Sequence, residues 1–245
     1  MVNHKNRNNS LAGKFLGLAA LSAGIVLLSV PAFAQLENAL STTAGKPTAY
    51  AAENCNSQEF SGKTGAAVNT ALSYANAGAH IDALSKLNSV LSYPDLCPYE
   101  LSTVYQMIGS SEYELNNYPR TIMAFENAID TGGLTDQEVS ALRINIAQLY
   151  IASDEFAKGA QLLEAFERNG GTLKPAHIEM LWQSCVQAED YDRALPWAKK
   201  WYDAASPKAR KHYDLMNFLY AQTGQPEKQA EIQSHIEIMN GTELK

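Results

Sequence analysis

Apolar positions recur with the period of an α-helix from about Thr64 to Met239, and polar positions fill the intervals between them. Within this stretch one short phrase occurs five times. It has an opening residue that is usually Tyr or Phe, then two variable residues, and then a residue, usually a small one, that begins an apolar run. These positions are separated by 38, 38, 35 and 35 residues, at Ala83, Thr121, Gly159, Ala194 and Gln229. A repeat of this length predicts stacked helical hairpins, because one hairpin cannot bury its own apolar face without a neighbour.

Small residues occur where two helices of a hairpin would cross closely, and larger residues occur where they would fill the gaps beside the crossing. The residues with this character are Tyr74, Ala83, Gly109, Phe125, Ala128, Ala147, Tyr150, Ala194 and Tyr220. Their spacing resembles the tetratricopeptide-repeat (TPR) pattern of about 34 residues. The resemblance covers about residues 64–239. It departs from the pattern at Glu112, where an aromatic residue is expected, and at Trp182 and Trp201, where small residues are expected.

Some phrases are similar to those of a narrower group, the exported repeat proteins of Gram-negative bacteria that accompany TonB/ExbB/ExbD energy-transducing systems. The phrases are residues 118–126, 146–150, 190–196 and 219–224. This resemblance implies a periplasmic adaptor that supports TonB-dependent outer-membrane transport.

The predicted fold class is therefore all-α, a right-handed superhelical α-solenoid of about five TPR-like hairpins. We expect a signal peptide over residues 1–34, a flexible N-terminal segment over 35–62, and the repeat domain over 63–245. Residues 35–62 are rich in Ala, Thr, Ser, Asn and Gly and show little periodicity.

The first 34 residues have the form of a secretory signal peptide. Three basic residues, Lys5, Arg7 and Lys14, precede an apolar stretch over residues 15–30, and an Ala-x-Ala site ends at Ala34. The apolar stretch is short for a membrane span. We therefore expect cleavage after Ala34, a periplasmic protein, and no stable membrane insertion after cleavage; an uncleaved N-terminal anchor is the alternative.

Cleavage would remove three basic residues and leave 16 basic against 26 acidic side chains. An acidic surface of this kind repels phosphate backbones and anionic lipid headgroups. The composition therefore disfavours nucleic acids and membrane surfaces as partners.

Three cysteines remain in the expected mature chain: Cys55, Cys97 and Cys185. Cys55 precedes the first predicted hairpin and Cys97 follows it, so a disulfide between them would fasten the N-terminal segment across that repeat. Spacing alone leaves both the bridged and the unbridged state open. Cys185 falls on an inward-facing position, which predicts a buried, inert thiol.

Catalytic and cofactor signatures are absent from the sequence. The histidines of the expected mature chain, His80, His177, His212 and His235, have no metal-binding spacing, and there is no nucleophile elbow or glycine-rich phosphate loop. We expect no metal, no cofactor and no enzymatic activity.

The first helix of each predicted hairpin would line a concave groove. The residues on the groove-facing positions are Gln106, Tyr113, Gln148, Glu179, Gln183, Gln187, Asp214 and Phe218. Amide side chains donate and accept hydrogen bonds, so this series suits the backbone of an extended peptide. The predicted partner is a protein or peptide segment, such as an envelope transport component.

A second hypothesis concerns the aromatic residues Trp182, Trp197, Trp201, Tyr202 and Tyr213. They either fill a larger gap between the fourth and fifth repeats or bind a small ligand or cell-wall fragment by stacking.

Overall fold

The computed structural model describes residue 55 and residues 60–243, and within these residues every regular element is a helix. The described chain divides into two compact units, and the boundary in the sequence lies between Leu149 and Tyr150. We call them the N-terminal unit (described at residues 55 and 60–149) and the C-terminal unit (residues 150–243). The predicted signal peptide and most of the predicted flexible segment lie outside the described residues. The all-α prediction is confirmed for the part that is described.

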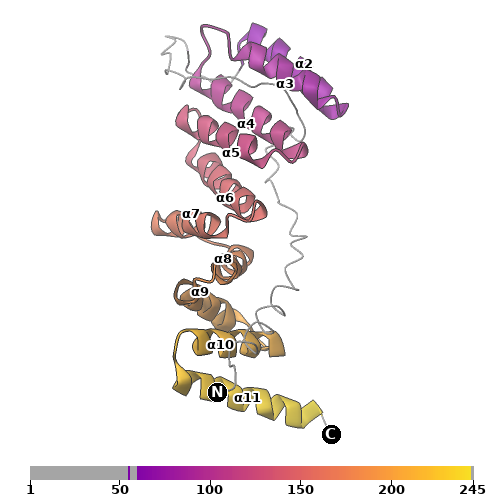
Figure 1. Ribbon diagram of the computed structural model, residues 1–245. Coiled ribbons are helices and arrows are strands. Elements are labelled where there is room, and N and C mark those ends of the chain that lie inside the picture. The colour runs from indigo at the N-terminus through magenta and orange to yellow at the C-terminus, as the bar shows by residue number, and fades with distance from the viewer. Residues whose placement is uncertain (1–54, 56–59, 244–245) are drawn as a thin grey trace, which may run out of the picture. The chain divides into compact units, whose positions relative to one another are not determined.

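The N-terminal unit contains α2 (Gly62–Asn76), α3 (His80–Val90), α4 (Pro98–Glu114), α5 (Tyr118–Asp130) and most of α6 (Asp136–Ala152). Helix α2 packs against α3, and α4 packs against α5 (Figure 1). Leu84 and Leu87 on α3, Met107 on α4 and Phe125 on α5 are fully buried. These side chains form the core between the paired helices, as the apolar periodicity predicts.

The C-terminal unit contains α7 (Phe156–Arg168), α8 (Pro175–Gln187), α9 (Tyr191–Ala204), α10 (Arg210–Gln222) and α11 (Pro226–Glu243). The pairs here are α8 with α9 and α10 with α11, and α8 also packs against α7. Leu163, Leu181, Leu215 and Leu219 are fully buried and supply the core of this unit. The handedness of the predicted superhelix stays a prediction.

One turn geometry recurs at the end of α2, α4, α6, α8 and α10. The residue two places before the next helix has a positive φ, and these residues are Gly78, Asn116, Asp154, Glu189 and Gly224. The following N–H donates to a carbonyl five residues back, as Ala79 does to Tyr74 and Asp190 does to Cys185, each at 2.9 Å. This is the Schellman arrangement, which satisfies carbonyls that the helix leaves free and reverses the chain.

The five opening residues of the repeated phrase are the first residues of α3, α5, α7, α9 and α11. The small residues three places later are buried in the first four, at Ala83, Thr121, Gly159 and Ala194, whereas Gln229 in α11 is only half-buried. The pattern therefore predicts the start of each second helix correctly, and the last helix departs from the inward packing of the others.

The departures from the repeat pattern have local explanations. Glu112 is buried at its aromatic position because its carboxylate accepts hydrogen bonds from Asn117 Nδ2 at 2.9 Å and Arg120 Nη1 at 3.4 Å. Trp182 and Trp201 replace small residues on α8 and α9 and contact each other, with ring centroids 5.3 Å apart. Two large side chains thus fill one helix crossing together.

Candidate functional site

The predicted groove residues lie on four helices, as the periodicity indicates. Gln106 and Tyr113 are on α4 and Gln148 is on α6, all in the N-terminal unit; Glu179, Gln183 and Gln187 are on α8, and Asp214 and Phe218 are on α10, all in the C-terminal unit. Their exposure and hydrogen bonding differ greatly, so they do not form one uniform set.

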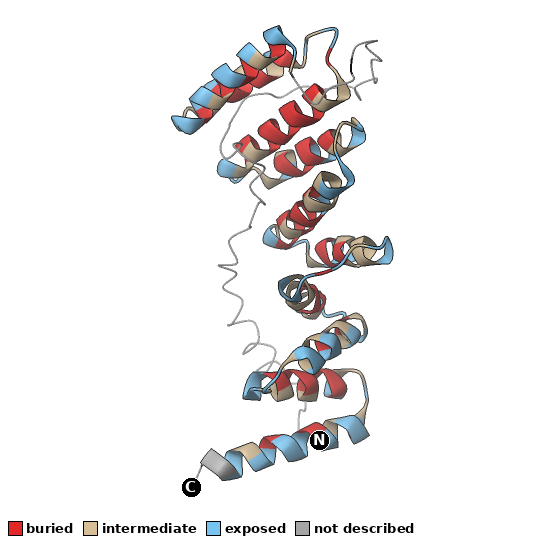
Figure 2. Cartoon of the chain, turned by 180° about the vertical axis from the view of Figure 1, so that it is seen from behind, coloured by how far each residue is buried: buried red, intermediate tan, exposed pale blue. Residues whose placement is uncertain are grey.

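Gln106 and Phe218 do not line an exposed surface, which corrects the prediction for these two residues. Each has only 4% of its surface exposed. Helix α4 is buried over most of its length (Figure 2), and Gln106 is one of its buried residues. Phe218 packs with its ring edge-on to Tyr191, at a centroid distance of 5.4 Å, and belongs to the core between α9 and α10.

Two further predicted residues, Tyr113 and Asp214, have partners within the protein, and a third, Gln148, is half-buried. Tyr113 stacks on Tyr118 at a centroid distance of 6.0 Å. Asp214 accepts a hydrogen bond from Arg210 Nε at 2.7 Å. The Oε1 atom of Gln148 is buried and has no hydrogen-bond partner among the described residues, so a ligand on the surface does not reach it. These side chains offer little to a partner in this conformation.

Glu179, Gln183 and Gln187 differ from the rest. Successive members are four residues apart on α8, so their side chains share one helix face. All three are half-buried, and none of their side chains makes a hydrogen bond or ion pair with another described residue. We call these three residues the α8 polar stripe. It presents one carboxylate and two amides, which can both accept and donate hydrogen bonds.

The opposite side of α8 is held firmly in the core. Leu181, Trp182 and Cys185 have between 0% and 6% of their surface exposed. Helices α7 and α9 both pack against α8. The stripe is therefore presented by a fixed helix, which lowers the ordering cost of binding.

Helices α7 and α9 are joined by a network around Glu164. Arg193 donates to both carboxylate oxygens, at 2.9 and 2.7 Å, and Trp197 Nε1 donates to Oε1 at 3.0 Å. Burial acts to raise the pKa of Glu164, but the hydrogen bonds from Arg193 and Trp197 outweigh it, and its pKa is lowered from the ordinary value. This network fixes two of the helices that surround α8.

The aromatic residues of the C-terminal unit are used in packing. Trp182 contacts Trp201, whose ring lies 4.4 Å from the imidazole of His212. Tyr202 meets Tyr213 edge-on at 5.7 Å, and Trp197 donates to Glu164. Lysine ammonium groups lie over several of these rings, as Lys200 does over Trp197 and Lys211 over Trp201. The arrangement matches the gap-filling interpretation of the aromatic residues.

Cys185 is a buried free thiol, as predicted. Burial raises its pKa to about 12; the charge of Arg193 acts to lower this pKa, and the carboxylates of Glu164 and Asp190 act to raise it further. The reactive thiolate is therefore scarce at neutral pH, and Cys185 is unsuited to nucleophilic or redox chemistry.

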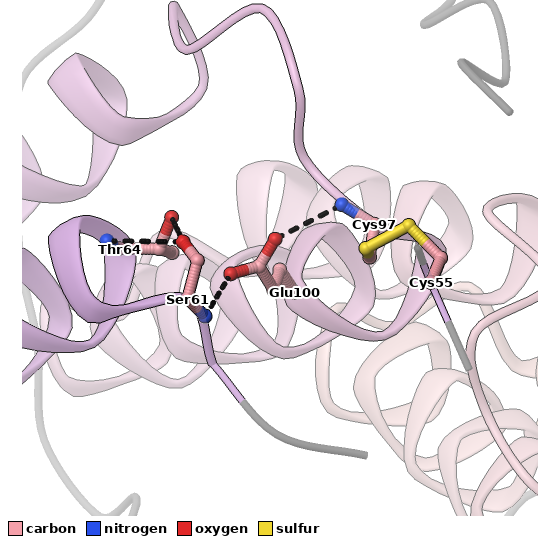
Figure 3. Close-up of a disulfide and its surroundings, with 5 residues drawn as sticks. All are labelled: Cys55, Ser61, Thr64, Cys97 and Glu100. Carbon is pink, nitrogen blue, oxygen red and sulfur yellow. Dashed lines mark hydrogen bonds between the residues drawn. A yellow bond between two sulfur atoms is a disulfide. The ribbon is translucent and has the colours of Figure 1, made fainter. Parts of the chain in front are cut away.

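Cys55 and Cys97 are joined by a disulfide, with their Cα atoms 5.4 Å apart (Figure 3). Beside it, the buried carboxylate of Glu100 accepts the Ser61 N–H at 2.7 Å through one oxygen and the Cys97 N–H at 3.0 Å through the other. The disulfide and Glu100 together fasten the chain before α2 to the start of α4. We call these four residues the Glu100 clasp.

Sequence reasoning missed two of these features. Glu100 stands three residues after the N-cap Cys97, and this capping-box spacing could have indicated one of its two bonds. No local sequence pattern indicates its hydrogen bond to Ser61, which is 39 residues away. The same holds for the hydrogen bonds between Glu164 and Arg193, which are 29 residues apart.

Within the described residues, no three His, Cys, Asp or Glu side chains gather closely enough to hold a metal ion. None of the helices in that part of the chain combines the length and the hydropathy needed to cross a membrane.

Comparisons with known proteins include a structural likeness. No protein-family model and no curated protein matches this chain. A similar solved structure is described as MamA 41-end from Desulfovibrio magneticus RS-1; it shares 15% sequence identity with a TM-score of 0.47, and the match covers 74% of this chain and 97% of that one. A likeness of this strength carries no functional argument, so the function is inferred from the residues of this chain.

Proposed function

We propose that this protein is a non-enzymatic scaffold that binds a segment of another protein along the α8 polar stripe. The observation that carries the proposal is the combination of Glu179, Gln183 and Gln187 on one helix face without internal partners. Of the residues in the N-terminal unit that were expected to share this role, Gln106 is buried, Tyr113 stacks on Tyr118, and Gln148 has its Oε1 atom buried.

The chemistry of the stripe fits an extended backbone. Each glutamine amide can accept a backbone N–H and donate to a backbone carbonyl, while Glu179 accepts only. Residues four apart on a helix are about 6 Å apart along its axis, close to the spacing of alternate residues in an extended strand. A bound segment that places a donor near Glu179 therefore gains a charge-assisted hydrogen bond as well.

We propose further that the scaffold works in the periplasm. The signal-peptide pattern ending at Ala34 supports this location, and the Cys55–Cys97 disulfide is compatible with an oxidising compartment. The sequence resemblance to repeat proteins that accompany TonB/ExbB/ExbD systems points to an envelope transport component as the first partner to test.

The test compares partner capture by the wild-type protein and by the triple variant Glu179→Ala, Gln183→Ala and Gln187→Ala, using periplasmic extract and quantitative mass spectrometry. A matched control replaces Gln233 and Glu237, which are exposed on α11 and also four residues apart. We expect the first variant to lose a partner that the control retains, with unchanged thermal stability. Equal capture by all three proteins would remove the α8 polar stripe from the account.

The aromatic residues of the C-terminal unit do not support a second function. Trp182 has 6% of its surface exposed, and Trp197 and Trp201 make contacts within the unit. These observations favour packing over ligand stacking.

A further inference from the structure

Four helices begin with the same backbone-to-side-chain hydrogen bond. In each, the third helical residue accepts the N–H of the residue that caps the helix. The accepting residues are Glu100 in α4, Glu138 in α6, His177 in α8 and His212 in α10. The N-terminal unit thus uses carboxylates at this position, and the C-terminal unit uses imidazoles.

The imidazole caps depend on one unprotonated nitrogen. His177 Nδ1 accepts the Lys174 N–H at 3.4 Å, and His212 Nδ1 accepts the Ala209 N–H at 2.8 Å. A protonated imidazole has no acceptor and carries a positive charge at the positive end of the helix dipole. Protonation therefore removes the hydrogen bond and adds a repulsion, whereas a carboxylate cap brings a negative charge to that end of the helix.

We propose that these two histidine caps form an acid-sensitive device that loosens the starts of α8 and α10 in mildly acidic solution while α4 and α6 stay capped. Helix α8 is also the helix that carries Glu179, Gln183 and Gln187. The proposal does not depend on what those residues bind, because it concerns only the start of each helix.

The sign of the effect follows from the surroundings of His177. Burial and the ammonium of Lys174 both lower its pKa below the ordinary value of 6.5. The unfolded chain then binds more protons than the folded chain in this range, so the free energy of unfolding decreases as pH falls below about 6.5.

Charged groups on the neighbouring helices are largely paired with one another. Helices α7 and α9 pack against α8. Their ion pairs are Lys158 with Glu155, Glu164 with Arg193, Glu164 with Arg168, Glu167 with Lys200, and Lys199 with Asp203, and α9 also carries Asp192 in its first turn. Helices α9 and α11 pack against α10. The imidazole of His212 lies next to the neutral ring of Trp201, and the ammonium group of Lys211 lies over that ring. The ionisable residues of α11 whose side chains are described are Glu227, Lys228, Glu231, His235 and Glu237.

The first measurement is amide hydrogen exchange of the wild-type protein near pH 7.5 and near pH 5, with each rate corrected for the intrinsic exchange rate of an unprotected amide at that pH. We expect exchange in the first turns of α8 and α10 to become about fivefold faster at the lower pH, the effect of losing one cap, with no change in α4 and α6. The double variant His177→Glu and His212→Glu should lose this response, because it installs the cap of α4 and α6. His235→Gln, on an exposed position of α11, is the matched control and should keep it. The same acid response in wild type and double variant overturns the proposal.

A second measurement needs no variant. Nitrogen-15 spectra of the imidazoles at neutral pH distinguish the two tautomers, and the caps require Nδ1 to be unprotonated in both residues. His212 Nδ1 also lies 3.0 Å from the Ala209 carbonyl oxygen, to which the other tautomer would donate. A proton on Nδ1 in either residue at neutral pH contradicts the capping role of that residue.

Discussion

Arg193 on α9 donates one hydrogen bond to each carboxylate oxygen of Glu164 on α7, at 2.9 and 2.7 Å, across 29 residues of sequence. A paired arginine and carboxylate of this geometry is both directional and charge-assisted. The two side chains retain 26% and 14% of their exposure, so water screens the pair only in part. This contact joins the two helices that pack against α8.

Removing the carboxylate should therefore destabilise the C-terminal unit. Glu164→Ala leaves Arg193 and Trp197 without their acceptor, and we expect a loss of about 2 kcal/mol in the free energy of unfolding. Urea unfolding measures it, and a double-mutant cycle with Arg193→Ala isolates the pair. Asp203→Ala breaks an exposed Lys199 pair and should cost about 0.5 kcal/mol or less. Equal costs for the two variants would contradict a special role for Glu164.

The pH dependence of this pair has a definite sign. The pKa of Glu164 is lowered in the folded protein. Its contribution is therefore fully present above the ordinary carboxyl pKa of about 4.5 and is lost as pH falls through the lower, folded value. The difference in stability between wild type and Glu164→Ala should shrink below about pH 4.5, as acid titrations of both proteins would show.

The Cys55–Cys97 disulfide closes a loop across a sequence separation of 42. Replacing both cysteines with serine should lower the free energy of unfolding by about 4 kcal/mol, because the unfolded chain regains the entropy of that loop. Denaturant unfolding of oxidised wild type and of the variant measures the difference. Reduced wild type should behave like the variant, and a reduced protein as stable as the oxidised one would contradict the prediction.

Gly109 on α4 faces Phe125 on α5 at the crossing of the two helices. A Cβ at position 109 would overlap the ring of Phe125. Gly109→Ala should therefore cost about 1–3 kcal/mol through overpacking, although alanine is the better helix former. Gly62→Ala is the control, since a Cβ there meets nothing within 4 Å. Thermal unfolding of both variants tests this, and a Gly109→Ala protein as stable as the control would contradict it.

Glu189 adopts a φ of 57° in the turn after α8, at the place where glycine stands after α2 and α10. Glutamate in this left-handed conformation is unfavourable by about 1 kcal/mol relative to glycine. Glu189→Gly should raise the free energy of unfolding by about 0.5–1 kcal/mol, whereas Gly224→Ala at the equivalent turn should lower it by a similar amount. Calorimetry that gave the same sign for both substitutions would contradict the turn assignment.

The all-α fold class and the first residues of the helices could be predicted from the sequence, because both depend on local patterns. The repeated phrase marks the first residue of each second helix, from His80 to Pro226. Small residues such as Ala83 and Ala194 are buried because the helix crossing leaves no room for larger ones.

The candidate site could be predicted only in part. Periodicity placed Gln106 and Gln183 on equivalent helices, but it could not show that Gln106 is buried while Gln183 is half-buried without a partner. That difference depends on which helices pack against each face. The sequence showed only that His177 and His212 lack a metal-binding spacing, and their capping role required the 3.4 and 2.8 Å contacts to backbone N–H groups.

Photo-crosslinking along α8 in living cells tests whether a partner binds at the α8 polar stripe. A photoreactive amino acid is placed in turn at Glu179, Gln183 and Gln187, and at the exposed control position Gln233 on α11. The account predicts the same protein adduct from all three α8 positions and none from position 233. Adducts of equal yield at position 233, or none from any position on α8, would contradict binding at the α8 polar stripe.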